Sequence, residues 1–375
     1  PPPPPPPPPP SFPDPATPEI YTLGRSSAAS DVYKRQSLPK SLVLYCAVPL
    51  IVGFVMLIPS SAAKAAPPLC DGKPATIVGT EGDDVLRGTN GDDVIVGRGG
   101  DDRLMGGGGN DTLCGQRGND TLVGGSGDDV LVGGPGSDWV SYGRAPFHQD
   151  RPNGVVVRLA AGTATGWGID QLTSIENIIG SRWRDHLVGN RFSNVIKGGD
   201  GWDKIKGRRG DDHLLGGPDT DALWGDAGND LLDGHEGGES LYGGWGTDIL
   251  RGGPGHDFLI PGGGDDIVDG GGDADHATYA PTGPGGVPSP PNGIVVDLRT
   301  GTVSGYGNDT LAGVEIVSGT EHDDVLIGGP GNDDFYGGWV DDYLDGGDGW
   351  DILNGGPDDD RCVRGEIYQS CEVIL

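Results

Sequence analysis

A nine-residue repeat runs without a gap from Gly79 to Ser141 and constrains the fold more than any other feature of this sequence. Seven consecutive units place glycine at positions 1 and 4, aspartate at position 6 and an apolar residue at position 8. Glycine and Asx residues favour turns with positive φ, so positions 1 to 6 predict a loop. The aliphatic triplet at positions 7 to 9 favours a three-residue strand whose middle side chain points inward. Two units therefore predict one eighteen-residue coil of a solenoid.

The repeat returns in two further blocks. Eleven units cover 180–278 and five cover 319–363, which makes 23 units in all. The chain contains 73 glycines and only 6% aromatic residues, which is too few large apolar side chains for one globular core of 375 residues. The predicted fold class is therefore all-β, a parallel β-roll or β-helix solenoid built from nonapeptide repeats.

Stacked coils would place the position-6 aspartates above one another along both edges of the solenoid. Two carboxylates about 5 Å apart repel by roughly 1 kcal/mol even in water, so the stack needs a cation between its members. Carboxylates and turn carbonyls are hard oxygen donors, which suit Ca²⁺ better than Mg²⁺. The sequence therefore predicts multiple calcium ions. The predicted metal ligands are Asp84, Asp93, Asp102, Asp111, Asp120, Asp129, Asp138, Asp203, Asp212, Asp221, Asp230, Asp248, Asp257, Asp266, Asp275, Asp333, Asp342, Asp351 and Asp360.

Four position-6 residues are left out of this set. Asn194 and Glu239 replace the aspartate, while Asp185 and Asp324 open their blocks beside a position 4 that is not glycine. We expect turns without glycine at position 4 to bind calcium poorly, because a side chain crowds a backbone position that glycine keeps open.

Two non-repeating arms separate the blocks, and they are copies of one module. Eight residues of the first arm recur in the second at an offset of 139; Glu176, for example, recurs as Glu315. Alternating apolar residues predict strands that continue the solenoid as longer coils. We interpret the two glutamates as structural. The predicted organisation is block 1 over 66–141, arm 1 over 142–179, block 2 over 180–278, arm 2 over 279–318 and block 3 with a disulfide cap over 319–375.

The first 65 residues precede this organisation. Residues 1–36 are proline-rich and receive no function. Residues 37–65 read as a secretory signal peptide, because Lys40 precedes an apolar run and small residues around Ala65 provide a cleavage site. The apolar run is slightly long, so an uncleaved membrane anchor is the alternative.

Four cysteines follow this segment, and they allow three pairings. Proximity in the sequence favours Cys70 with Cys114 and Cys362 with Cys371, so that each disulfide would staple one end of the solenoid. No C-x-x-C spacing is present, so a zinc site is not expected. Paired cysteines fit an extracellular protein.

The net charge of −31 restricts the partners. It disfavours nucleic acid and anionic membranes and favours multivalent cations. An acidic chain with few large apolar residues is expected to be unfolded until metal binds. Neither a phosphate-binding loop, an H-E-x-x-H motif nor a G-x-S-x-G elbow occurs, so we predict that the protein is not an enzyme.

The nonamers resemble the RTX, or hemolysin-type, calcium-binding family over most of residues 79–363. The phrase SIENIIGSRWRDHLVGN at 174–190 is similar to the segment that leads into the repeats of serralysin-type secreted proteases. The opening LCDGKPATIVGTEGDDVLRG and the closing DRCVRGEIYQSCE look like small secreted calcium-binding proteins of actinobacteria, which carry repeats and no enzyme. The resemblance implies that position-6 aspartates bind calcium together with turn carbonyls.

These observations favour a secreted, monomeric, non-catalytic calcium-binding β-roll that acts as an extracellular or cell-surface structural or interaction module. One alternative is the calcium-folded module of a secreted hydrolase or polysaccharide-modifying enzyme. Another is an adhesin. The sequence leaves the partner open, with a cell-surface component or a polysaccharide as the candidates.

Overall fold

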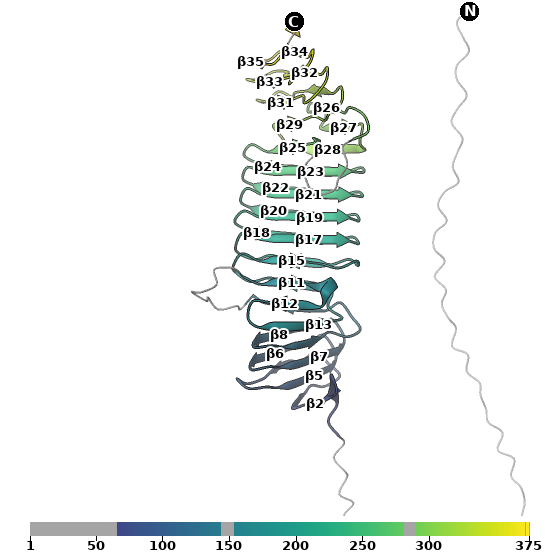
Figure 1. The fold of residues 1–375 in the computed structure, drawn as a ribbon, viewed down its shortest axis with the longest axis vertical. Helices are drawn as coiled ribbons and strands as arrows, with labels where there is room; N and C mark the ends of the chain where they lie inside the picture. The colour runs from purple at the N-terminus through teal and green to yellow at the C-terminus, as the bar shows by residue number, and fades with distance from the viewer. Residues whose placement is uncertain (1–65, 144–153, 281–289, 372, 375) are drawn as a thin grey trace, which may run out of the picture. The chain divides into compact units, whose positions relative to one another are not determined.

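The computed structural model describes residues 66–143, 154–280, 290–371 and 373–374. These residues form stacked coils in which strands of successive coils lie above one another, as β17, β19, β21 and β23 do in Figure 1. The all-β solenoid predicted from the repeats is confirmed. The predicted signal peptide at 37–65 lies outside the described residues. The described part of the chain contains no helix with the length and apolar character needed to cross a bilayer.

Two parallel sheets form the walls of the solenoid. In spatial order the first sheet contains β3 (Ile77–Val78), β5 (Val94–Gly99), β7 (Thr112–Arg117), β9 (Val130–Val132), β13 (Ile169–Thr173), β12 (Thr163–Thr165), β11 (Val156–Arg158), β15 (His186–Val188), β17 (Lys204–Arg209), β19 (Ala222–Ala227), β21 (Ser240–Trp245), β23 (Phe258–Gly263), β25 (His276–Thr278), β29 (Ile316–Ser318), β31 (Asp334–Tyr336), β33 (Ile352–Asn354) and β35 (Ile367–Gln369).

The second sheet contains β4 (Val85–Arg87), β6 (Arg103–Gly108), β8 (Thr121–Ser126), β10 (Trp139–Ser141), β14 (Asn177–Ile179), β16 (Val195–Lys197), β18 (His213–Pro218), β20 (Leu231–Glu236), β22 (Ile249–Pro254), β24 (Ile267–Gly272), β28 (Asn308–Ala312), β27 (Thr302–Ser304), β26 (Val295–Asp297), β30 (Val325–Ile327), β32 (Tyr343–Asp345), β34 (Arg361–Val363) and β36 (Val373–Ile374). A short hairpin, β1 (Leu69–Cys70) with β2 (Lys73–Pro74), precedes both sheets.

Register confirms the eighteen-residue coil. Within a block each residue pairs with the residue eighteen positions later, as Ile205 does with Leu223 and Leu223 with Leu241. The position-8 side chains form the core: Leu223 and Leu232 are 0% exposed, and even Ala277 and Cys362 are fully buried there. Each coil therefore contributes two apolar side chains, one from each sheet, and coils must stack to exclude water from them.

The strands of the block interiors are longer than the repeat predicts. β5 and β7 each span six residues, because positions 1 to 3 of the next unit continue the ladder; Arg98, for example, pairs with Gln116. The expectation that positions 1 to 6 are all loop was therefore wrong for the first three. Backbone groups of stacked coils face one another there and form hydrogen bonds. Position 2 accordingly adopts positive φ, even in Arg98 at 91°.

Each arm inserts an antiparallel meander into one sheet. β12 pairs antiparallel with both β11 and β13, while β13 pairs parallel with β9 and β11 pairs parallel with β15. In the second arm β26, β27 and β28 repeat this arrangement between β24 and β30. A 3₁₀ turn, η1 (Leu159–Ala161), follows β11 and ends at Gly162 with φ 65°. The arms thus continue the sheets, as expected, but through antiparallel strands.

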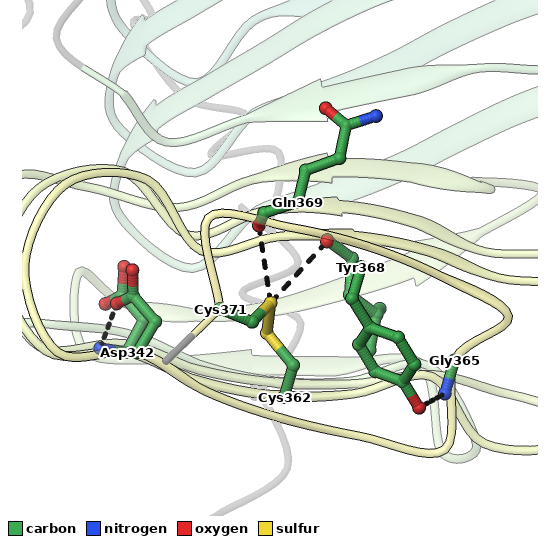
Figure 2. The surroundings of a disulfide bond; sticks show 8 residues. Asp342, Cys362, Gly365, Tyr368, Gln369 and Cys371 are labelled. Atoms are coloured by element: carbon green, nitrogen blue, oxygen red, sulfur yellow. Dashed lines mark hydrogen bonds between the residues drawn. A yellow bond between two sulfur atoms is a disulfide. The ribbon is translucent and has the colours of Figure 1, made fainter. Parts of the chain in front are cut away.

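Both predicted disulfides are confirmed. Cys70 and Cys114, with Cα atoms 5.7 Å apart, join the N-terminal hairpin to β7. Cys362 and Cys371, with Cα atoms 5.8 Å apart, tie the last residues of the chain to β34. Figure 2 shows this second bridge, where Cys371 Sγ lies 3.3 Å from the carbonyl oxygen of Gln369. Each end of the stack, which lacks a neighbouring coil, is therefore crosslinked.

The glycine at position 1 is expected to be intolerant of any side chain. A Cβ on Gly225 would lie 2.4 Å from Asp230 Oδ2 and 2.6 Å from the carbonyl oxygen of Gly243, whereas a Cβ on Gly272 would meet nothing within 4 Å. We predict that Gly225→Ala lowers the free energy of unfolding in calcium by about 1–3 kcal/mol through overpacking. Gly272→Ala should change it by no more than about 0.5 kcal/mol. Chemical denaturation followed by circular dichroism measures both, and equal effects would contradict the packing described.

Candidate metal centre

The position-6 carboxylates form a hydrogen-bonded ladder along each edge of the solenoid. The Oδ1 atom of Asp120 accepts the backbone N–H of Asp102 over 2.8 Å, and Asp248 Oδ1 accepts the N–H of Asp230 over the same distance. Each carboxylate therefore reaches towards the preceding coil. Asp120 is 0% exposed and Asp230 is 1% exposed. The aspartates are stacked at intervals of eighteen residues, and they are buried.

The second oxygen of the interior carboxylates has no hydrogen-bond donor. It is buried and faces the glycine at position 1, where a Cβ on Gly115 would lie 2.0 Å from Asp120 Oδ2. Burying an oxygen of a carboxylate without a partner is unfavourable unless a proton or a cation satisfies it. Among the described residues, this oxygen lacks a donor in Asp102, Asp111, Asp120, Asp129, Asp138, Asp203, Asp212, Asp221, Asp230, Asp248, Asp266, Asp275, Asp342 and Asp351.

The opening turns of the blocks are different, because the protein itself supplies a donor to this oxygen. The Thr80 N–H donates to Asp84 Oδ2 over 2.6 Å, and the Thr89 N–H donates to Asp93 Oδ2 over 2.7 Å. The sequence pattern set apart only Asp185 and Asp324, whereas Asp84, Asp93 and Asp333 were predicted as metal ligands like the interior aspartates. The sequence feature that distinguishes most of these opening turns is a serine, threonine or asparagine at position 2. The same bond to the position-2 N–H is made by Asp185, Asp324 and Asp333.

Asn194 shows what happens when the carboxylate is replaced by an amide. Its Oδ1 accepts the Asn190 N–H over 2.8 Å, and its Nδ2 donates to the carbonyl oxygen of Glu176 over 2.7 Å. The amide NH₂ group, a neutral donor, thus contacts a carbonyl of the preceding coil. This turn needs no cation.

The arms end each ladder with side chains that sequence analysis did not assign to the site. The Asp129 N–H donates to Asp170 Oδ1 over 3.2 Å, and the Tyr142 hydroxyl donates to Asp170 Oδ2 over 2.8 Å. In the second arm Asp309 and the Tyr279 hydroxyl make the same contact. The offset of 139 between Asp170 and Asp309 was the available signal. Where the repeats stop, a tyrosine hydroxyl therefore donates to the second carboxylate oxygen, which has no donor in the block interiors.

The two arm glutamates take the position of the next aspartate. The Asp138 N–H donates to Glu176 Oε2 over 2.9 Å, and the Asp275 N–H donates to Glu315 Oε2 over 3.1 Å. Each glutamate carboxylate thus accepts a hydrogen bond from the backbone of the preceding coil. The structural role expected of Glu176 and Glu315 agrees with these bonds.

Burial is the largest cause of the raised pKa values in the ladder. It raises the pKa of Asp120 to about 6, of Asp129 to about 7 and of Asp203 and Asp212 to about 8. The N–H bond from the preceding coil lowers each pKa, and the neighbouring carboxylates raise it by less than burial does. The sequence prediction named repulsion between stacked carboxylates as the reason for a cation, and burial adds a larger contribution to these pKa values.

The donor set fits calcium better than a transition metal. Within the described ranges, no three or more His, Cys, Asp or Glu side chains converge on one point. A cation beside a ladder oxygen would therefore depend on backbone carbonyls for its remaining ligands. Such a carbonyl is found beside the second oxygen: a Cβ on Gly97 would lie close to Asp102 Oδ2 and also 2.9 Å from the carbonyl oxygen of Gly115 in the next coil. Ca²⁺ accepts six to eight such oxygens in a flexible geometry.

A second ladder runs along the exposed side of the turns, at position 5. Asp83 Oδ1 accepts the N–H of Asp101 over 2.8 Å, and Asp101 Oδ1 accepts the N–H of Asn119 over 2.7 Å. These side chains reach towards the following coil, opposite to the position-6 carboxylates. The repeat pattern alone did not predict this role. Because the position-5 groups are exposed to water, they hold the turns in register without needing a cation.

Comparison with protein families gives one match. The family described as the RTX calcium-binding nonapeptide repeat (4 copies) matches residues 78–113, 115–144, 184–214, 206–238, 215–250, 242–277, 303–344 and 341–362. Together these ranges cover more than half of the chain. Comparison with curated proteins gave no match.

Without metal, stability should fall as the pH rises. The interior carboxyls have folded pKa values of about 6 to 8 for Asp120, Asp129 and Asp203, against 3.8 in the unfolded chain. Between these values the folded state binds more protons than the unfolded state, so raising the pH favours unfolding. We predict that the chain in chelator is folded near the acidic end of this window and unfolds as the pH passes through about 6 to 8. Circular dichroism against pH tests this, and a flat or rising stability in chelator would contradict it.

Glu239 is expected to be a weak point in the ladder. No hydrogen bond among the described residues joins the Asp221 N–H to Glu239. Burial, together with the neighbouring Asp257, raises the pKa of Glu239. Glu239→Asp should let the shorter side chain accept the Asp221 N–H and raise the free energy of unfolding in calcium by about 1 kcal/mol. The control is Glu236→Asp in the exposed part of β20, which should have no effect. A loss of stability in Glu239→Asp would count against the ladder geometry.

Proposed function

Because the chain belongs to the RTX calcium-binding nonapeptide-repeat family, we propose that it is a secreted, non-catalytic protein whose β-roll folds when calcium binds. The observation that carries the proposal is the set of buried second oxygens in the block interiors, which have no protein donor. The opening turns and the arms satisfy the equivalent oxygen with an N–H or a hydroxyl. The calcium ion would thus bind the second carboxylate oxygens to which the protein supplies no hydrogen-bond donor.

Each part of the repeat has a task in this proposal. The position-6 carboxylate holds the preceding coil through Oδ1 and offers Oδ2 to the metal, as in Asp120. The position-1 glycine leaves space beside that oxygen. The position-8 side chains close the core once the coils stack. Bound Ca²⁺ supplies the positive charge that offsets the buried carboxylates.

Secretion is supported by chemistry as well as by the predicted signal peptide. Weak calcium sites are filled at the high calcium concentration outside cells and stay empty at the low concentration inside. The disulfides Cys70–Cys114 and Cys362–Cys371 form in oxidising compartments. A chain that stays unfolded until export would then fold on reaching calcium.

A non-catalytic role is supported by what the acidic side chains contact. The best acid/base candidates of the arms, Glu176 and Glu315, accept backbone N–H groups. Asp170 and Asp309 accept tyrosine hydroxyls. Carboxylates held in this way are positioned to stabilise the coil junctions, and we assign them no reaction.

A calcium titration tests folding on binding. The full chain in chelator at pH 8 should show a disordered circular dichroism spectrum and gain β structure cooperatively as calcium is added. The half-saturation is expected at about 0.1–1 mM, the range of extracellular calcium modules. Magnesium at equal concentration is the control and should induce less structure. A circular dichroism spectrum that does not change when calcium is added would contradict the proposal.

Substitution of an interior aspartate should have opposite effects with and without calcium. Asp120→Asn keeps the Oδ1 acceptor and removes the buried charge, so it should lower the number of calcium ions bound but stabilise the chelated form at pH 8. In Asp185→Asn the new NH₂ group would face either the Ser181 or the Val155 N–H, so this variant should lose stability with little change in calcium stoichiometry. Titration calorimetry measures the number of calcium ions that each variant binds. An equal loss of bound calcium in the two variants would contradict the assignment of Asp120 as a calcium ligand and of Asp185 as a structural residue.

A further inference from the structure

The coils that follow the two copies of the arm module carry opposite charge. Residues 182–209, which follow the first arm, contain eight basic and three acidic residues. The matching stretch at 321–348 contains nine acidic residues and no basic one. Both stretches have the same architecture, since Val156 pairs with His186 in the first copy and Val295 pairs with Val325 in the second. The fold therefore does not require the positive charge of the first copy.

The basic stretch lines a pocket of about 650 Å³ beside the 3₁₀ turn η1. Arg191, Arg208 and Arg209 line it together with Leu159 and Phe192. The Arg191 guanidinium lies 4.8 Å from the centre of the Phe192 ring. Phe192 is 59% exposed, so its ring is open to a ligand. The pocket thus combines positive charge with an apolar surface.

The three arginines have no acidic partner in the described part of the chain. The one carboxylate in the lining, Asp226, is paired with Lys206 at 3.0 Å. The remaining ion pairs of the described residues lie elsewhere. In a chain with net charge −31, three unpaired guanidinium groups in one pocket point to an anionic ligand.

The second copy lacks the three arginines and the phenylalanine of this pocket. At an offset of 139, Arg191 becomes Pro330, Arg208 becomes Gly347 and Arg209 becomes Asp348, while Phe192 becomes Gly331. The second copy therefore serves as an internal comparison: it has no ring at the position of Phe192, and the one cation at a matching lining position, Arg299 in place of Ala160, is paired with Asp297.

The surface extends along the edge of the solenoid to an exposed tryptophan. Arg209 pairs with Ala227, and Ala227 pairs with Trp245, so the three occupy the same position of successive coils. Coils lie about 4.8 Å apart, which places Arg209 and Trp245 roughly 10 Å from each other along the axis. Trp245 is 49% exposed. An extended ligand therefore meets guanidinium groups first and an aromatic ring two coils further on.

We propose that this surface binds a segment of an acidic polysaccharide, a site separate from the calcium ladder. The sugar carboxylates or sulfates pair with Arg191, Arg208 and Arg209, whose planar guanidinium groups match such anions. The apolar faces of the sugar rings pack on Phe192 and Trp245. A single-stranded nucleic acid fits less well, because its binding proteins line the whole path with positive charge, and here acidic coils follow on the C-terminal side.

Titration calorimetry of the calcium-loaded full chain with tetragalacturonate tests the proposal. The matched ligand is its methyl ester, which has the same sugars and no charge. Wild type should bind the acid form only. The triple variant Arg191→Gln, Arg208→Gln and Arg209→Gln should lose at least about tenfold in affinity. Glutamine suits position 2, since Gln116 occupies it with φ 79°.

Controls separate loss of the site from loss of charge or fold. Removing three arginines elsewhere, by Arg103→Gln, Arg117→Gln and Arg251→Gln, should leave the affinity unchanged. The calcium-induced circular dichroism of both triple variants should match wild type, so that a lost site is distinguishable from a failure to fold. Trp245→Ala should weaken binding without altering its dependence on salt. The proposal is overturned if the acid form does not bind, if the first triple variant binds it equally, or if only a DNA oligonucleotide or anionic vesicles bind through these arginines.

Discussion

A buried carboxylate with one oxygen bonded to the preceding coil and the other lacking a donor is the interaction on which the solenoid depends. In Asp120 the first oxygen fixes the register of the coils and the second lies against the position-1 glycine. The same side chain therefore connects the coils and makes the connection costly without a cation. Repeating this arrangement along both edges couples folding of the whole block to metal binding.

The sequence predicted the features that depend on local period. The spacing of nine placed Leu223 in the core and stacked the aspartates, because both follow from counting residues around a coil. Both disulfides were predicted from the proximity of their cysteines in the sequence. The sequence did not predict the donor to each second oxygen. Whether Asp93 receives the Thr89 N–H, or Asp170 the Tyr142 hydroxyl, depends on the conformation of a turn or on contacts across the arm. The antiparallel direction of β12 was likewise invisible in alternating apolar residues, which are the same for both directions.

The duplicated arms show how the scaffold separates stability from surface chemistry. Inward residues and coil junctions are kept in both copies, as Tyr142 with Asp170 and Tyr279 with Asp309 demonstrate. Outward residues are free to change from basic to acidic, because they contribute little to stacking. A solenoid of this kind can therefore carry a distinct binding surface on one copy while calcium binding in the block interiors stays the same.

Crystals of the full chain grown with a lanthanide in place of calcium test most directly whether the interior carboxylates bind metal, since anomalous scattering locates each ion. The account predicts ions within about 2.3–2.6 Å of the second oxygens of interior aspartates such as Asp120 and Asp230. It predicts none beside Asp185 or Asp170, whose second oxygens already accept hydrogen bonds from Ser181 and Tyr142. Ions bound elsewhere, or interior oxygens paired with protein donors in their absence, would contradict it.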